Sequence, residues 1–89
     1  MKREEEEEVA ALYAELLEMG RRDPNPGTEL YAAYLEADKP RARAIGKRLE
    51  ELGGWPLMVV VHERLVKEAP PYSGRHLDFA WDGVGGWAA

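Results

Sequence analysis

Hydrophobic residues recur along the first part of the chain at the spacing of an amphipathic helix. Between residues 4 and 20 they stand at positions 9, 12, 13, 16, 17 and 19, which lie on one helical face. Glutamates fill positions 4–8, where the helix dipole favours negative charge. Gly20 is placed to end the helix in the left-handed conformation. We therefore expect a helix over 4–20.

A second, shorter helix is predicted after a turn. The segment 23–27 contains two prolines and a glycine, which favour a turn, and Thr28 is a suitable N-cap. Apolar residues then recur at helical spacing, which predicts a helix over 28–37.

A third helix is predicted directly afterwards. Asp38 is expected to cap it, and Pro40 falls in its first turn, where proline is tolerated. Apolar residues at 42, 45, 49 and 52 form its buried face, and the glycine pair 53–54 ends it. We expect this helix to span 39–53.

The next segment permits two interpretations. Three consecutive valines at 59–61 favour a strand over 57–62. Pro56 suits a first helical turn, and apolar residues recur every four positions from 57 to 65. The length of the segment favours a helix over 56–68, with the strand as the alternative.

The end of the chain has a different composition. Prolines and a glycine break the pattern at 70–74, and a short helical turn is expected near 74–82. The tail over 83–89 is rich in glycine and contains Trp87; because disordered tails are poor in aromatic residues, it is expected to pack down. The sequence thus predicts one all-α domain over 1–89, a small four-helix bundle-like domain with this Gly/Trp-rich segment packed against it.

Composition narrows the class of protein. The chain has 89 residues, a mass of 10.0 kDa and no cysteine, which indicates one domain without disulfides. The longest apolar run, 57–61, is far shorter than a membrane helix, and the N-terminus lacks a signal core. We therefore expect a cytoplasmic protein with no membrane partner. The scarcity of Asn, Gln and Cys is typical of thermophile proteins.

Charge is distributed unevenly around a net value of −5. Residues 1–20 carry a net charge of −5, whereas residues 39–54 carry +3. The acidic first helix and the basic third helix are therefore expected to lie side by side within one chain or to pair between copies.

Basic residues on the third predicted helix suggest a nucleic-acid contact as one alternative. They are Arg41, Arg43, Lys47 and Arg48, and the helix could be read as the second helix of a helix-turn-helix. The isoelectric point near 5.0 disfavours phosphate binding, so a solvated face with salt bridges is the simpler interpretation.

A small metal site or enzyme centre is a second alternative. Its candidate ligands are His62, His76, Asp78 and Asp82. The zinc-protease pattern that begins at His62-Glu63 lacks its second histidine, because position 66 is valine. The glycines at 83–86 are not followed by a predicted helix, so a C-cap and a tight turn are expected there rather than a phosphate loop. Capping and solvent exposure explain these residues more simply, so we predict no catalytic residue, metal or cofactor.

The leading functional hypothesis is a non-enzymatic protein–protein interaction or regulatory module. Aromatic residues and arginine are enriched where proteins meet, and they are also common in small cores. The predicted surface consists of Trp55, Trp81 and Trp87, with Arg64 and Arg75 at its rim. The expected partner is another protein or a second copy of the chain.

Several short motifs resemble a group of small bacterial proteins of unknown function. They are Ala44-Ile45-Gly46, Leu52-Gly53-Gly54, Met58, His62-Glu63-Arg64 and the segment from Leu77 to Trp87, which ends in Trp81-Asp82-Gly83-Val84-Gly85-Gly86-Trp87. This terminal segment is the specific part of the resemblance. The resemblance implies a small cytosolic bacterial protein and no particular activity.

Overall fold

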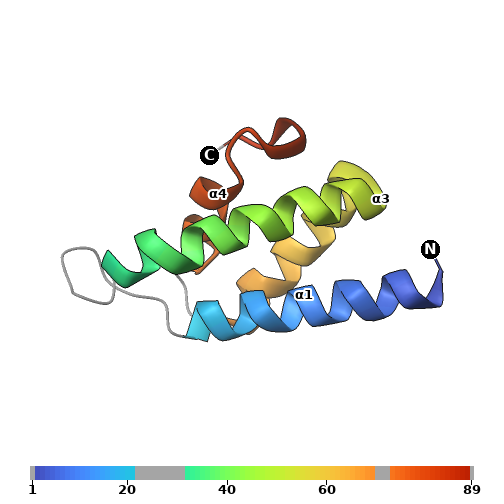
Figure 1. Ribbon diagram of the computed structural model, residues 1–89, viewed down its shortest axis with the longest axis horizontal. Coiled ribbons are helices and arrows are strands. Elements are labelled where there is room, and N and C mark those ends of the chain that lie inside the picture. The colour runs from blue at the N-terminus through green and yellow to red at the C-terminus, as the bar shows by residue number, and fades with distance from the viewer. Residues whose placement is uncertain (1, 22–31, 70–72, 89) are drawn as a thin grey trace.

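The chain is helical, as seen in a computed structural model that describes residues 2–21, 32–69 and 73–88. The elements run in the order α1 (Arg3–Arg21), a π-helical turn (Tyr34–Asp38), α3 (Lys39–Glu68), α4 (Ser73–Trp81) and a 3₁₀ turn (Val84–Gly86) (Figure 1). The described residues contain no strand. The all-α prediction is therefore confirmed, as is the choice of helix over strand at 57–62.

A four-helix bundle is not supported. The two helices predicted over 39–53 and 56–68 are the two halves of α3, which is bent at Gly54. Of the helix predicted over 28–37, residues 28–31 lie outside the described residues, together with the turn at 23–27 and the Thr28 cap. The remainder runs on into α3 without a break.

The predicted start at residue 39 agrees with the first residue of α3, but the predicted cap at Asp38 is wrong. Asp38 has helical backbone angles and makes no side-chain capping bond, and the chain is already helical from residue 32. The backbone N–H of Lys39 donates to the carbonyl of Tyr34, five residues back, in the wider spacing of a π-turn. Pro40 follows at once and lacks an N–H, so this wider turn leaves room for its ring inside a continuous helix.

Gly20 does not end α1 in the left-handed conformation. The helix continues to Arg21, and the described glycines with positive φ are all elsewhere in the chain. Gly20 is buried and lines a small crevice of about 30 Å³ with Tyr34 and Ala42.

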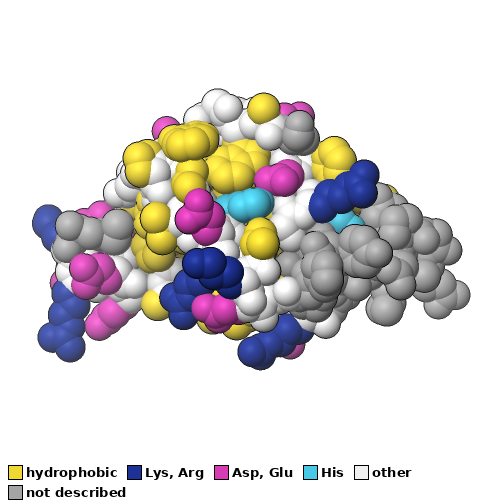
Figure 2. All heavy atoms as spheres, turned by 180° about the vertical axis from the view of Figure 1, so that it is seen from behind, with side chains coloured by type: hydrophobic (Ala, Val, Ile, Leu, Met, Phe, Trp, Pro, Cys, Tyr) yellow, Lys and Arg dark blue, Asp and Glu magenta, His cyan; other side chains and the backbone are white. Residues whose placement is uncertain are grey.

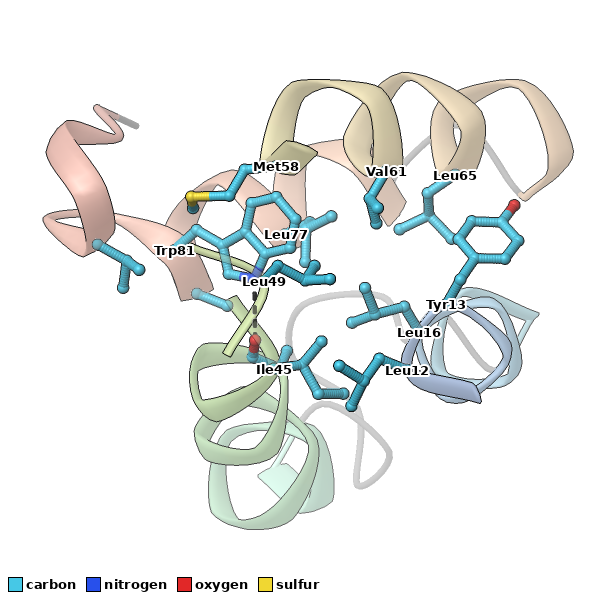
Figure 3. Packing of buried hydrophobic residues seen from close by; sticks show 13 residues of the cluster. Leu12, Tyr13, Leu16, Ile45, Leu49, Met58, Val61, Leu65, Leu77 and Trp81 are labelled. Atoms are coloured by element: carbon cyan, nitrogen blue, oxygen red, sulfur yellow. Dashed lines mark hydrogen bonds between the residues drawn. The ribbon is translucent and has the colours of Figure 1, made fainter. Parts of the chain in front are cut away.

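The chain turns back at Gly54, and the second half of α3 crosses the first half at a steep angle (Figures 1 and 3). Gly54 has φ +70° and ψ −166°, a conformation that glycine alone adopts readily. Pro56 lies in the first turn after this bend, where its missing N–H costs no hydrogen bond.

The core lies between α1, the two halves of α3 and α4 (Figure 3). Trp81 of α4 lies between Met58 on one half of α3 and Ile45 on the other. The residues buried most completely are Leu16, Ile45, Leu49, Met58 and Trp81. No helix in the described ranges is both long and apolar enough to cross a bilayer.

Candidate functional site

The second half of α3 carries apolar side chains on the face that it turns to solvent. Trp55 is 52% exposed, Val60 60% and Val66 50%. Trp55, the partly buried Val59 and Val66 lie within about 40° of one another around the helix axis, whereas Val60 lies about 120° away and lines the groove beside α1. An outer helix face is normally polar, so apolar side chains exposed there are unusual. From behind, hydrophobic side chains gather around a histidine (Figure 2).

Tryptophan rings form a connected cluster beside this face. The ring centres of Trp55 and Trp87 are 6.0 Å apart, and Trp87 meets Trp81 edge to face at 5.1 Å. His62 lies 5.1 Å from Trp87. These distances and the tilted or perpendicular orientations are those of favourable aromatic pairs.

Asp78 of α4 is the polar centre of the cluster. Its Oδ1 accepts a hydrogen bond from Trp87 Nε1 at 3.1 Å and lies 2.8 Å from His62 Nε2. His62 Nε2 also lies 3.2 Å from the carbonyl oxygen of Gly74. Because both neighbours of Nε2 are acceptors, this nitrogen must carry the proton. One carboxylate oxygen therefore joins the second half of α3, α4 and the tail.

The tail is held by its own backbone as well. Gly83 N–H donates to the carbonyl of Trp87 at 2.7 Å, and Trp87 N–H donates to that of Val84 at 2.9 Å. Positive φ angles at Gly83, Gly85 and Gly86 permit this tight turn. The Gly/Trp-rich segment thus packs against its own chain, as the sequence predicted.

Trp81 does not lie on the predicted surface. Its side chain is 0% exposed, and its indole N–H donates to the carbonyl of Ala42 at 2.8 Å (Figure 3). Gly46, one turn further along the same helix, lies directly beside the indole. Trp81 is a core residue that attaches α4 to the first half of α3.

The two arginines predicted at the rim contact other groups. Arg64 lies 4.2 Å above the ring of Tyr13 on α1 and bonds to Glu68 at 2.8 Å. Arg75 lies 5.9 Å from the ring of Phe79 on its own helix. Arg64 therefore joins α1 to α3, and neither residue is held by the tryptophan cluster.

Arginines of the alternative nucleic-acid surface form contacts within the chain. Arg41 makes a two-bond pair with Glu15 at 2.8 and 3.1 Å, and Arg43 donates to the carbonyls of Ala80 and Asp82 at 3.2 and 2.6 Å. Lys47 is exposed. Arg43 thus satisfies carbonyls at the C-terminal end of α4, a position that favours a cation.

Arg48 pairs with Glu8 through two bonds of 2.5 and 2.9 Å and also reaches Glu51. The hydrogen bond to Arg48 lowers the pKa of the Glu8 carboxyl, and the same contact is the largest cause that raises the pKa of Arg48. Acidic α1 and the basic first half of α3 therefore lie side by side within one chain, which was one of the two predicted arrangements.

The four candidate metal ligands do not converge. The structure brings together His62 and Asp78, whereas the ring of His76 lies 4.8 Å from that of Tyr34. The described ranges contain no group of three or more His, Asp or Glu side chains that could hold a metal ion.

An open, shallow surface lies further along α3, beside His62, Glu63, Val66 and Lys67. A narrower groove of about 190 Å³ runs between α1 and the second half of α3, beside Val60. Both are bordered by apolar side chains and by charged ones.

Comparisons with models of protein families, with curated proteins and with solved structures found no match. The functional argument therefore depends on the geometry of this chain.

Sequence reasoning did not identify Val59, Val60 or Val66 as surface residues. A signal was present, because the segment from 55 to 61 is apolar all round and cannot bury every side of a helix at the edge of a small domain. It also missed the contact of Asp78 with Trp87, which depends on how the tail folds.

Proposed function

We propose that this protein is a non-enzymatic protein–protein interaction module. Its contact surface is the outer face of the second half of α3, which we call the Trp55 face. The face consists of Trp55, Val59, His62, Glu63, Val66 and Lys67. The observation that carries the proposal is the exposure of Trp55 and Val66 on an outer helix face, where polar side chains are expected.

Trp55 is the anchor of this surface. Tryptophan is among the residue types most enriched at the energetic centres of interfaces. About half of its side chain is exposed, so a partner could remove roughly 100 Å² of apolar surface from water, worth on the order of 2–3 kcal/mol.

The surface is also held in place before any partner binds. Trp55 packs on Trp87, which is hydrogen-bonded to Asp78 and perpendicular to the ring of Trp81. A pre-ordered anchor loses little conformational entropy on binding, which favours affinity.

The other two hypotheses receive less support. Guanidinium groups of Arg41 and Arg48 are occupied by carboxylates of α1, which reduces the positive charge offered to a phosphate backbone. The metal hypothesis is left with the His62–Asp78 pair. A cytoplasmic location and the resemblance to small bacterial proteins stay predictions.

Binding to wild-type protein and to a Trp55→Ala variant tests the proposal. Each is immobilised and exposed both to the free protein itself and to an extract of cells that produce it. The matched control is Leu35→Ala, which removes another exposed apolar residue, 42% exposed, outside the Trp55 face. We expect a species that wild-type protein and the control retain and that Trp55→Ala loses. Equal retention by all three proteins, or none by any, would contradict the proposal, provided that circular dichroism shows them equally folded.

A further inference from the structure

We infer that the aromatic cluster around Trp87 is a binding site for an indole ring, which the chain's own tail fills in this structure. The ligand it takes is an aromatic ring with an N–H donor at its edge, supplied from outside when Trp87 is withdrawn. We call the site the indole recess; its walls are Trp55, His62, Asp78 and Trp81. The inference goes beyond the proposed function and does not depend on a partner for the Trp55 face.

The structure shows how such a ring is recognised, because Trp87 already occupies the recess. Its Nε1 donates to Asp78 Oδ1 at 3.1 Å. Its ring is perpendicular to that of Trp81 at 5.1 Å between centres. The rings of His62 and Trp55 lie 5.1 and 6.0 Å away, tilted by 48° and 40°. Three rings and one carboxylate thus surround a single indole, and apolar walls with few polar groups are the usual composition of a small-ligand site.

The inner walls of the recess are held by contacts that do not involve the tail. Trp81 is fully buried and donates to a backbone carbonyl of α3 at 2.8 Å. His62 Nε2 lies 3.2 Å from the carbonyl oxygen of Gly74 and 2.8 Å from Asp78 Oδ1. Removal of the Trp87 side chain therefore leaves these walls in place and takes one donor from Asp78. Spaces lined by apolar side chains in this way bind small aromatic molecules.

The tail is attached to the rest of the chain by few contacts. Its two backbone hydrogen bonds, from Gly83 to Trp87 and from Trp87 to Val84, lie within the tail itself. In the described part of the chain, one hydrogen bond joins residues 83–88 to the helices, that of Trp87 to Asp78. Val84 is buried, whereas Trp87 is partly exposed. The tail is therefore a tethered ligand, whose advantage over a free ring is its high local concentration.

Titration with indole, followed by two-dimensional NMR, compares wild-type protein with a Trp87→Ala variant that empties the recess. We expect the variant to bind indole with a Kd on the order of 1 mM or below. Wild-type protein should bind it at least about tenfold more weakly, because its tail competes. Trp87→Phe is the matched control, since its ring refills the recess and should weaken indole binding toward the wild-type value. Equal binding by wild-type protein and Trp87→Ala, or none by either, would overturn the inference.

The role of Asp78 is tested by removing the hydrogen bond from either side. Benzofuran has nearly the shape of indole but carries an oxygen in place of the N–H group. Asp78→Ala in the Trp87→Ala background removes the acceptor instead. Each change should weaken binding about tenfold. If indole and benzofuran bind equally tightly, or if loss of the carboxylate changes nothing, the recess does not recognise the N–H donor and the inference is overturned.

Loss of the Trp87 side chain can also unfold the chain, and the same titration then has a second readout. Indole that binds the folded state shifts the folding equilibrium toward that state. The helical circular dichroism signal of Trp87→Ala should then rise with indole and rise less with benzofuran. A signal that indole leaves unchanged would overturn the inference in that case.

A tryptophan derivative distinguishes a free indole from a tryptophan side chain of another protein. N-Acetyltryptophan amide carries the peptide groups that adjoin the ring of Trp87. If Trp87→Ala binds it more tightly than indole, the recess takes a side chain; if more weakly, the recess takes a free small molecule. These results leave the proposed function untouched, because its test measures protein binding through the exposed side of Trp55.

Discussion

Asp78 connects three parts of the molecule through a single oxygen atom. His62 and Trp87 both reach its Oδ1, and the two donors come from α3 and from the tail. The carboxylate is partly exposed, so water can replace some of what a substitution removes. Its contribution is therefore to hold the aromatic cluster in position rather than to provide a large share of the stability.

Replacing Asp78 measures that contribution. Asp78→Ala removes the acceptor of Trp87 Nε1–H and one of the two acceptors beside His62 Nε2, and should lower the free energy of unfolding by about 1 kcal/mol. Asp78→Asn keeps an oxygen acceptor in the same position and should lose clearly less. Urea unfolding followed by circular dichroism gives both values. Equal losses for the two variants would show that the shared acceptor is not what stabilises the cluster.

Replacing Gly46 with alanine should destabilise the protein, although alanine has the higher helix propensity. In an exposed helix, alanine is more favourable than glycine by about 1 kcal/mol. A Cβ at Gly46 would lie 2.5 Å from Nε1 of Trp81, whose hydrogen bond to Ala42 fixes its position. We therefore expect Gly46→Ala to destabilise the protein by about 2 kcal/mol, as overpacking of a core does.

A double variant checks the cause. Trp81→Phe shortens the ring that Gly46→Ala would contact, so the combined loss should be smaller than the sum of the two single losses. Strict additivity in thermal or urea unfolding would indicate that the clash is not responsible.

At the scale of elements, the reversal within α3 positions both the core and the Trp55 face. It depends on Gly54, whose φ of +70° and ψ of −166° are unfavourable for any L-residue with a side chain. The nearest atom to an added Cβ is Pro56 Cδ at 3.6 Å, an ordinary contact, so a substitution would be strained through its backbone and not by crowding.

Gly54→Ala should therefore lower the free energy of unfolding by about 1–3 kcal/mol. The matched control is D-alanine at the same position in a chemically synthesised chain. It adds the same methyl group, but its preferred angles are the mirror image of those of L-alanine and include this conformation. D-Alanine should be tolerated where L-alanine is not; equal losses in urea unfolding would contradict the backbone explanation.

At the scale of the whole molecule, the contact of Tyr13 on α1 with α3 makes the free energy of unfolding fall as the pH rises in the alkaline range. Burial raises the pKa of Tyr13 above its ordinary value of 10.0, and the nearby Glu68 carboxylate raises it further. The folded state thus holds this proton more tightly than the unfolded state does. Its contribution is complete below about pH 10 and is lost as the pH rises through the folded pKa.

We expect Tyr13→Phe to flatten the alkaline loss of stability. The phenyl ring keeps the packing against Arg64, while the ionisable hydroxyl is gone. Melting temperatures from about pH 8 to about pH 11.5 for the two proteins supply the comparison. Parallel curves would show that Tyr13 does not titrate differently in the folded state.

Local patterns predicted most of the fold. The spacing of apolar residues in 4–20 and 56–68 is a property of a single helix, so the sequence was sufficient to predict both elements. The capping role predicted for Asp38 was wrong, because the chain is already helical from residue 32. This helical stretch is attached to α4 at two points. Tyr34 donates to the carbonyl of His76, and Arg43 donates to that of Ala80.

The candidate site was predicted only in part. The sequence identified Trp55 and Trp87, and the structure places their rings together. The sequence did not distinguish Trp81, which is buried, from Trp55, which is exposed. Burial at these positions is decided by how the halves of α3 and α4 meet.

The reversal at Gly54 also bears on the order in which the molecule assembles. Leu49 and Met58 are close together in the sequence, so the contact between the two halves of α3 closes a short loop at little entropic cost. Docking of α1 on α3 closes a much longer loop. We expect the two halves of α3 to pack together in the folding transition state and α1 to dock afterwards. Truncation of Leu49 to alanine should then slow refolding, while truncation of Leu12 should mainly speed unfolding, as stopped-flow kinetics would show.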